Sequence, residues 1–300
     1  MAGAAKEVVV SDPIVLSGER TIVSIDPDEG GAITAYETDL GHERLPWLHA
    51  ATRDFPASFP LVPFASRIFH GRFEFGGHTV ALPGNNPPEP HAIHGHGWQK
   101  AWDVTEFSSD MACLRYLHEA DAWPWVYEAV QKFEVSGFSL RLSLSVRNLS
   151  STPMPLGLGI HPFFVRTRFC RIRARCTHMW ETDDEVMSLK KIPSSPDMPL
   201  DEGVEPAARV MDNVFAGWDG RIRIDWPEWG VGLDIKASQP LTHLVIYSPP
   251  GMSFFCAEPV SNTADAFNVM SRGEEGHGAV ILASGETLSA GIEFSPDLQG

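Results

Sequence analysis

The segment Phe138–Arg147 decides the fold, and it reads FSLRLSLSVR. Apolar side chains alternate with serine and arginine along the whole segment. A period of two is typical of a β-strand that has one face on a core and the other in water. Asn148–Pro155, which follows, is rich in Ser, Pro and Asn, and this composition predicts a turn.

Short runs of this kind recur along the chain, separated by many of its 26 glycines and 24 prolines. We expect strands over Glu7–Val10, Thr21–Ile25, Ala32–Thr38, His78–Ala81, Ala101–Phe107, Met111–His118, Val126–Val135, Phe138–Arg147, Ile172–Cys176, Arg221–Asp225, Gly232–Lys236, His243–Tyr247, Ser253–Ala257 and Leu288–Phe294. Many short strands divided by turn residues predict an all-β sandwich or barrel. Asp183–Glu205 is acidic and contains several prolines, so we expect a long surface loop there. No linker, repeat or phosphate-binding glycine loop interrupts this pattern, which favours one domain over residues 1–300.

The composition argues against several classes of function. The 39 acidic residues outnumber the 23 basic ones and give a formal net charge of −16, whereas nucleic acids and anionic membranes bind basic surfaces. No apolar run approaches the roughly 18 residues of a membrane span. The four cysteines form no CxxC pair, and the N-terminus lacks the apolar core of a signal peptide. We expect a soluble cytoplasmic protein, monomeric or homodimeric, with no nucleic-acid or membrane partner.

The segment Leu156–Phe164 carries a lone histidine, His161, between two glycines and a proline. A lone histidine on an apolar element is more often a core residue than a catalyst. Gly157 and Gly159 allow close approach of backbone or ligand, and Pro162 is expected to end the local strand ladder because it has no N–H to donate. These neighbours make His161 a candidate catalytic acid.

Two stretches earlier in the chain hold further candidates. Arg67 stands in the apolar segment LVPFASRIFHG, where it is either a paired structural ion or a ligand clamp. The segment PHAIHGHGWQKAW places three histidines at i, i+3 and i+5, a spacing that fits a solvated loop or a sugar pocket in which His94 donates to a hydroxyl. A metal site is less favoured, because no carboxylate or cysteine completes it at close spacing. We expect neither a metal nor a cofactor.

Three stretches in the second half of the chain bear charged groups. Arg166–Arg175 contains five arginines, which form either an anion site or a solvated strand face, and their alternation favours the latter. Asp212 is the better candidate acceptor for a sugar hydroxyl, because Asp219 precedes a glycine in a turn signal. Glu258 ends an apolar strand, where desolvation raises a carboxyl pKa and makes it a usable base.

Five of these motifs, in this order, resemble those of the aldose 1-epimerase (galactose mutarotase) family, and in particular its bacterial aldose-epimerase-like subgroup. They read VPFASRIFHGRF, HAIHGHGWQKAW, MPLGLGIHPFF, MDNVFAGW and CAEPVSNTADAFN. The resemblance implies a large twisted antiparallel β-sandwich of the galactose mutarotase-like supersandwich type. It also implies a cofactor-independent isomerase that acts on a sugar substrate.

The resemblance further implies a role for each candidate residue. His161 protonates the ring oxygen of the sugar while Glu258 removes the proton of the anomeric hydroxyl. Arg67, His94 and Asp212 bind other hydroxyls. Acid and base groups that titrate near neutral pH supply this chemistry without a metal.

Two departures from the family pattern put galactose itself in doubt as the substrate. Ser66 stands where many members have asparagine, and the segment SPPG at 248–251 lacks a glutamine that binds the sugar in galactose-type members. Three alternatives therefore stay open beside a mutarotase: a hexose-6-phosphate epimerase that uses the arginine run, a non-catalytic carbohydrate-binding protein with Trp98 and Trp102 as stacking platforms, and a glycoside hydrolase. The last is disfavoured because it usually needs two facing carboxylates.

Overall fold

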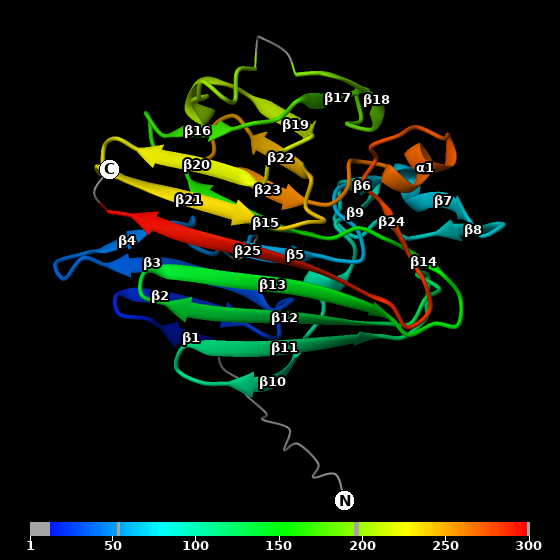
Figure 1. The fold of residues 1–300 in the computed structure, drawn as a ribbon, viewed down its shortest axis with the longest axis horizontal. Helices are drawn as coiled ribbons and strands as arrows, with labels where there is room; N and C mark the ends of the chain where they lie inside the picture. The colour runs from blue at the N-terminus through cyan, green and yellow to red at the C-terminus, as the bar shows by residue number, and fades with distance from the viewer. Residues whose placement is uncertain (1–12, 53–54, 195–197, 299–300) are drawn as a thin grey trace, which may run out of the picture.

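The chain folds into two large antiparallel β-sheets that lie face to face (Figure 1). The structure is a computed structural model, and it describes residues 13–52, 55–194 and 198–298. Within these residues, eleven strands form one sheet and eight form the other, so the predicted antiparallel β-sandwich is confirmed. The predicted strand Glu7–Val10 lies outside the described residues.

The eleven-stranded sheet has the order β1 (Ile14–Ser17), β2 (Thr21–Asp26), β3 (Ala32–Asp39), β5 (Ser58–Leu61), β15 (Gly159–Val165), β23 (Phe254–Val260), β22 (His243–Ser248), β19 (Met211–Ala216), β17 (His178–Thr182) and β18 (Ser188–Pro193), and β4 (Arg44–Pro46) pairs with β3. The eight-stranded sheet has the order β10 (Asp103–Phe107), β11 (Met111–His118), β12 (Tyr127–Ser136), β13 (Ser139–Asn148), β25 (Thr287–Asp297), β21 (Val231–Ala237), β20 (Arg221–Trp226) and β16 (Arg171–Ala174).

Shorter elements gather at one end of the sandwich, on the right of Figure 1. They are the strand pairs β6 (Arg67–Ile68) with β9 (Ala92–Ile93), β7 (Arg72–Phe75) with β8 (His78–Ala81) and β14 (Met154–Leu156) with β24 (Val280–Leu282), and the helix α1 (Ala266–Ser271). Single 3₁₀ turns are η1 (Phe69–Gly71), η2 (Gly97–Gln99) and η3 (Pro206–Ala208). In the described part of the chain no helix is long and apolar enough to cross a membrane.

The eight-stranded sheet follows the alternation seen in the sequence. Buried and more accessible residues alternate along β13, and the same holds for its neighbour β12. The buried faces pack against the other sheet, for example where Phe294 meets Tyr36 with ring centroids 6.0 Å apart. Each large apolar side chain buried in this way contributes about 1.5–3 kcal/mol to folding.

The central strands of the eleven-stranded sheet are buried on both faces. Ile160 and Phe164 of β15 belong to the core between the sheets, whereas Phe163 belongs to a second apolar cluster on the opposite face. On β23, Phe255 likewise faces the core and Cys256 the second cluster. The second cluster therefore lies on the outer face of the eleven-stranded sheet, and we call this face the floor. Every second side chain of β15 and β23 projects from the floor, away from the core.

Three local predictions need correction. Asp183–Glu205 is not one long loop, because β18 (Ser188–Pro193) pairs with β17 inside it. Pro162 does not end its strand, because β15 continues to Val165 and Pro162 pairs with Ser58 of β5. The turn predicted over Asn148–Pro155 is shorter, since its last two residues begin β14.

Candidate functional site

A cavity of about 470 Å³ opens above the floor of the eleven-stranded sheet, and it brings the predicted site residues together. All five of them line it: Arg67, His94, His161, Asp212 and Glu258. They come from five separate parts of the chain, so the tertiary fold and not local sequence assembles them. The volume lies within the 300–1,000 Å³ range that is usual for small-molecule sites.

His161 and Glu258 face each other across two adjacent strands. The register between β15 and β23 pairs Gly159 with Val260 and Phe163 with Cys256, which sets His161 opposite Glu258. The imidazole Nε2 lies 3.4 Å from the carboxyl Oε1. The sequence separates the two residues by almost a hundred positions, and only this register explains their contact.

Burial acts on the two groups in opposite directions. Removal from water lowers the pKa of His161 to about 3. The same desolvation raises the pKa of Glu258 well above its ordinary value, and the negative charge of Asp212 raises it further while Arg67 opposes the shift. Desolvation therefore favours the uncharged form of each group, which places the proton of the pair on Glu258.

Aromatic rings enclose the imidazole. The ring of His161 stacks on Phe59, at 4.7 Å between centroids, and on Phe163, at 4.6 Å. Trp98 stacks on Phe59 at 5.2 Å and also lines the cavity. This wall desolvates His161 and limits its rotation, and it offers an apolar surface to the C–H groups of a ligand.

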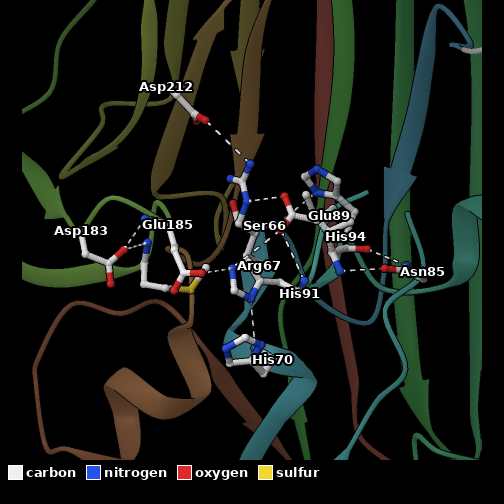
Figure 2. Close-up of polar contacts among 12 residues, drawn as sticks. Ser66, Arg67, His70, Asn85, Glu89, His91, His94, Asp183, Glu185 and Asp212 are labelled. Atoms are coloured by element: carbon white, nitrogen blue, oxygen red, sulfur yellow. Dashed lines mark hydrogen bonds and ion pairs between the residues drawn. The ribbon is translucent and has the colours of Figure 1, made fainter. Parts of the chain in front are cut away.

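Arg67 stands at the centre of an ion-pair network on the cavity rim (Figure 2). Its Nε donates to Glu89 Oε2 at 3.0 Å, and its second terminal nitrogen lies 3.9 Å from Asp212 Oδ2. Figure 2 shows the guanidinium between these two carboxylates. Arg67 is therefore both a paired ion and a cavity residue. The two interpretations of Arg67 from the sequence, a paired structural ion and a ligand clamp, do not exclude each other.

His94 is held by backbone contacts that determine its tautomer. Its Nδ1 accepts a hydrogen bond from the Ser66 N–H at 3.2 Å, and the Ser66 carbonyl accepts from the His94 N–H at 2.9 Å. Burial lowers the pKa of His94 well below its usual range, and the nearby His161 and Arg67 add to this effect. A neutral imidazole that accepts at Nδ1 carries its proton at Nε2, so His94 is a hydrogen-bond donor at that nitrogen.

The three histidines of the segment 91–96 point to different places and do not share a metal. His91 accepts at Nδ1 from the His70 N–H and lies near Glu89 and Glu185 (Figure 2). His96 hydrogen-bonds to Tyr127 at 2.8 Å behind the cavity wall. Only His94 reaches the cavity.

The second stacking platform predicted for a carbohydrate-binding protein is not available. Trp102 is 3% exposed, and its indole N–H donates to the Gly97 carbonyl. Trp98 alone of the predicted pair lines the cavity.

The arginine run does not line the cavity, and several of its members are engaged by other groups. Arg166 donates to the carbonyl of Pro249, a residue that lines the cavity, while Arg171 pairs with Glu205 and Arg173 pairs with Asp225. Exposed arginines alternate with buried residues along β16, as expected for a solvated face. None of the described residues that line the cavity belongs to this run.

Several cavity residues were not predicted as site residues. Glu89 is one of them, although a partly buried arginine such as Arg67 requires a carboxylate partner, which is a usable signal. Tyr247 and the strained Val186, which has a φ of +64°, also line the cavity. Their positions depend on the β19–β22 pairing and on the β17–β18 hairpin, which the sequence did not reveal.

Comparison with known proteins agrees with this geometry. The sequence model of the aldose 1-epimerase family matches residues 14–295. The chain belongs to the aldose 1-epimerase family. It is 28% identical over 271 residues to the uncharacterised protein YphB of Escherichia coli K12, with 88% of this chain and 91% of that protein covered.

Solved structures of the family share the fold. One from Escherichia coli K12, named only provisionally as an aldose 1-epimerase, has 26% identity and a TM-score of 0.86, covering 95% of this chain and 99% of that one. A galactose mutarotase-like protein from Clostridium acetobutylicum has 20% identity and a TM-score of 0.83, covering 97% and 98%. The resemblance drawn from the five sequence motifs is therefore confirmed.

Proposed function

We propose that the protein interconverts the α and β anomers of a free hexose or related aldose by opening and reclosing the sugar ring. The observation that carries the proposal is the buried His161–Glu258 pair, 3.4 Å apart at the floor of a cavity of about 470 Å³. Ring opening needs one group to give a proton to the ring oxygen and another to take the proton of the anomeric hydroxyl.

The pair holds the proton that is given to the ring oxygen, and it receives a second proton from the anomeric hydroxyl, so its proton count is unchanged by ring opening. With the proton on Glu258, the free protein offers a carboxylic acid and an unprotonated imidazole nitrogen. Transfer of that proton across the contact gives the imidazolium and carboxylate, in which His161 is the acid and Glu258 the base. Both forms contain the same protons, and reclosure of the ring uses the two groups in exchanged roles.

The remaining cavity residues suit the hydroxyls and the faces of a sugar. Arg67 and the His94 Nε2–H supply donors, and Asp212 supplies an acceptor. The apolar face of the ring packs against the aromatic wall formed by Phe59 and Trp98. A small number of polar groups on an otherwise apolar surface is typical of sites that orient a small ligand.

The charge of the cavity favours a sugar without phosphate. Arg67 is the one arginine among the described residues that line it, and it already contacts two carboxylates, Glu89 and Asp212. Phosphate recognition usually relies on arginine or lysine that is free to form bidentate or point-charge contacts. The alternative of a hexose-6-phosphate epimerase is therefore less well supported than a free-sugar mutarotase.

Exchange NMR across a panel of aldoses tests the proposal, with the spontaneous rate subtracted. Wild type should accelerate anomer exchange of at least one free aldose more than that of its 6-phosphate. Glu258→Gln should remove the acceleration, and the exposed Glu119→Gln should not. Full activity in Glu258→Gln contradicts the mechanism, and sugar binding without any acceleration by wild type indicates a carbohydrate-binding protein.

A further inference from the structure

A buried thiol lies beside the acid–base pair. Cys256 is two residues before Glu258 on β23, so both side chains project from the same face of the sheet. Cys256 pairs with Phe163, which comes two residues after His161 on β15, so the thiol lies next to His161 on the same face of the sheet. The thiol sulfur, one imidazole nitrogen and one carboxyl oxygen lie within 4.8 Å of one another.

Two atoms of this cluster have unmet hydrogen-bonding capacity. His161 Nδ1 and Glu258 Oε2 are buried and have no hydrogen-bond partner among the described residues. Buried polar atoms of native proteins are nearly always paired, so each of these two atoms calls for an explanation such as a redox or catalytic role or a bound ion or water. The proposed proton transfer uses the facing atoms of the pair and leaves these two atoms unexplained.

The ligand set is one that zinc prefers. Thiolate, imidazole and carboxylate are the three ligand types of protein zinc sites, and three protein ligands leave a fourth position open. Bond lengths of 2.0–2.3 Å in a tetrahedral site place ligand atoms about 3.3–3.8 Å apart, so atoms that lie within 4.8 Å of one another need to approach by at most about 1.5 Å. Hard cations such as Mg²⁺ select oxygen ligands and do not suit a thiolate.

We propose that His161, Cys256 and Glu258 form a site for a thiophilic divalent cation of the zinc type, and that its occupation switches off the proposed mutarotation. On binding, the ion replaces the thiol proton, which passes to solvent together with the proton held by the pair, and no electron is transferred. The fourth position faces the cavity, which His161 and Glu258 line. A bound ion occupies the lone pairs of both groups, so neither can move a proton.

Metal binding can be read without any enzyme assay. Metal-free full-length protein is titrated with Co²⁺, a spectroscopic substitute for Zn²⁺, and the sulfur-to-cobalt charge-transfer band is recorded. We expect one Co²⁺ per chain in wild type, displacement by Zn²⁺, loss of the band in Cys256→Ser, and retention in the control Cys113→Ser. Absence of the band in wild type, or its persistence in Cys256→Ser, overturns the site. Cys256→Ala serves as a second variant if the serine variant does not fold.

The regulatory half of the inference rests on the proposed function and has its own readout. Zn²⁺ should inhibit anomer exchange by wild type, and Mg²⁺ at the same concentration should not. Loss of even an outer contact of a metal site costs about 10–100-fold in affinity, so Cys256→Ser should need at least about 10-fold more Zn²⁺ for half-inhibition, relative to its own metal-free rate. Cobalt binding with unchanged or faster exchange overturns inhibition. If wild type exchanges no sugar at all, the proposed function fails while the cobalt spectrum still decides the metal site.

Discussion

Replacement of His161 by glutamine should change how the stability of the protein depends on pH. Unfolded histidine has a pKa near 6.5, whereas burial lowers the pKa of native His161 to about 3. Between these values the unfolded chain binds a proton that the native chain does not, so the free energy of unfolding falls as the pH drops from about 6.5 to about 3. Glutamine keeps a polar amide near the imidazole position and cannot titrate.

The size of the effect follows from the shift. Each pH unit within this window costs about 1.36 kcal/mol, so at pH 4.5, two units below the unfolded pKa, wild type has lost about 2.7 kcal/mol through His161. The variant has no such loss. The packing change caused by the substitution is the same at every pH, and it therefore cancels when the difference between the two proteins is compared at pH 7 and pH 4.5.

Urea unfolding followed by tryptophan fluorescence measures the difference. Between pH 7 and pH 4.5, His161→Gln should gain about 2.5 kcal/mol relative to wild type. His42→Gln is the matched control, because the His42 side chain is 76% exposed, and it should not reproduce this gain. Parallel pH dependences of His161→Gln and wild type would refute the argument that burial withholds a proton from His161, and with it the placement of the shared proton on Glu258.

Four further predictions concern the cavity and its surroundings. Glu258→Gln should slow anomer exchange by about 10²–10⁴-fold, the usual contribution of a positioned acid or base. The same variant should become more stable relative to wild type as the pH rises above about 4.5, because the buried native carboxyl keeps a proton that the unfolded one releases; urea unfolding at pH 5 and pH 7 measures this, and a constant difference contradicts it. Arg67→Lys should raise KM about 10-fold or more, since lysine lacks the planar fork that contacts two carboxylates, and steady-state kinetics with unchanged KM would show that Arg67 does not bind the sugar. Arg171→Ala, which removes a surface ion pair, should leave exchange of both free and 6-phosphorylated sugars unchanged in the same NMR assay.

Strands with one wet face were predictable from the sequence, and strands with two buried faces were harder. β13 alternates between buried and accessible residues, and its period of two predicts it directly. β15 and β5 are buried almost throughout, so they read as apolar runs in which periodicity carries no information. The site lies on these central strands, so its floor was the part of the fold that was hardest to predict from the sequence.

The candidate residues were predictable one by one, but their arrangement was not. Their residue types indicated that His161 could act as an acid and Glu258 as a base, and the family resemblance predicted that they act together. Nothing in the spacing of the chain shows that the two lie 3.4 Å apart, because the β15–β23 register sets that distance. Glu89 was not predicted as a site residue, because its place in the cavity depends on a contact with Arg67 that only the folded loop creates.

The pairing of β15 with β23 explains how two titratable groups, His161 and Glu258, come to lie side by side in a desolvated site. In the described part of the chain, β15 pairs with β23 at Gly159 and again from Phe163, but at none of the residues between them, where Pro162 has no N–H to give. His161 lies within this gap, and the paired residues on either side hold its register. A slip of one residue would turn the imidazole into the core and an apolar residue toward the cavity. A Cβ on Gly159 would lie 2.7 Å from the Pro259 carbonyl oxygen, so the close approach that this glycine permits is that of the neighbouring strand and not of a ligand. The position of the proposed acid–base pair therefore depends on the β15–β23 register, because the register determines which side chains meet at the cavity.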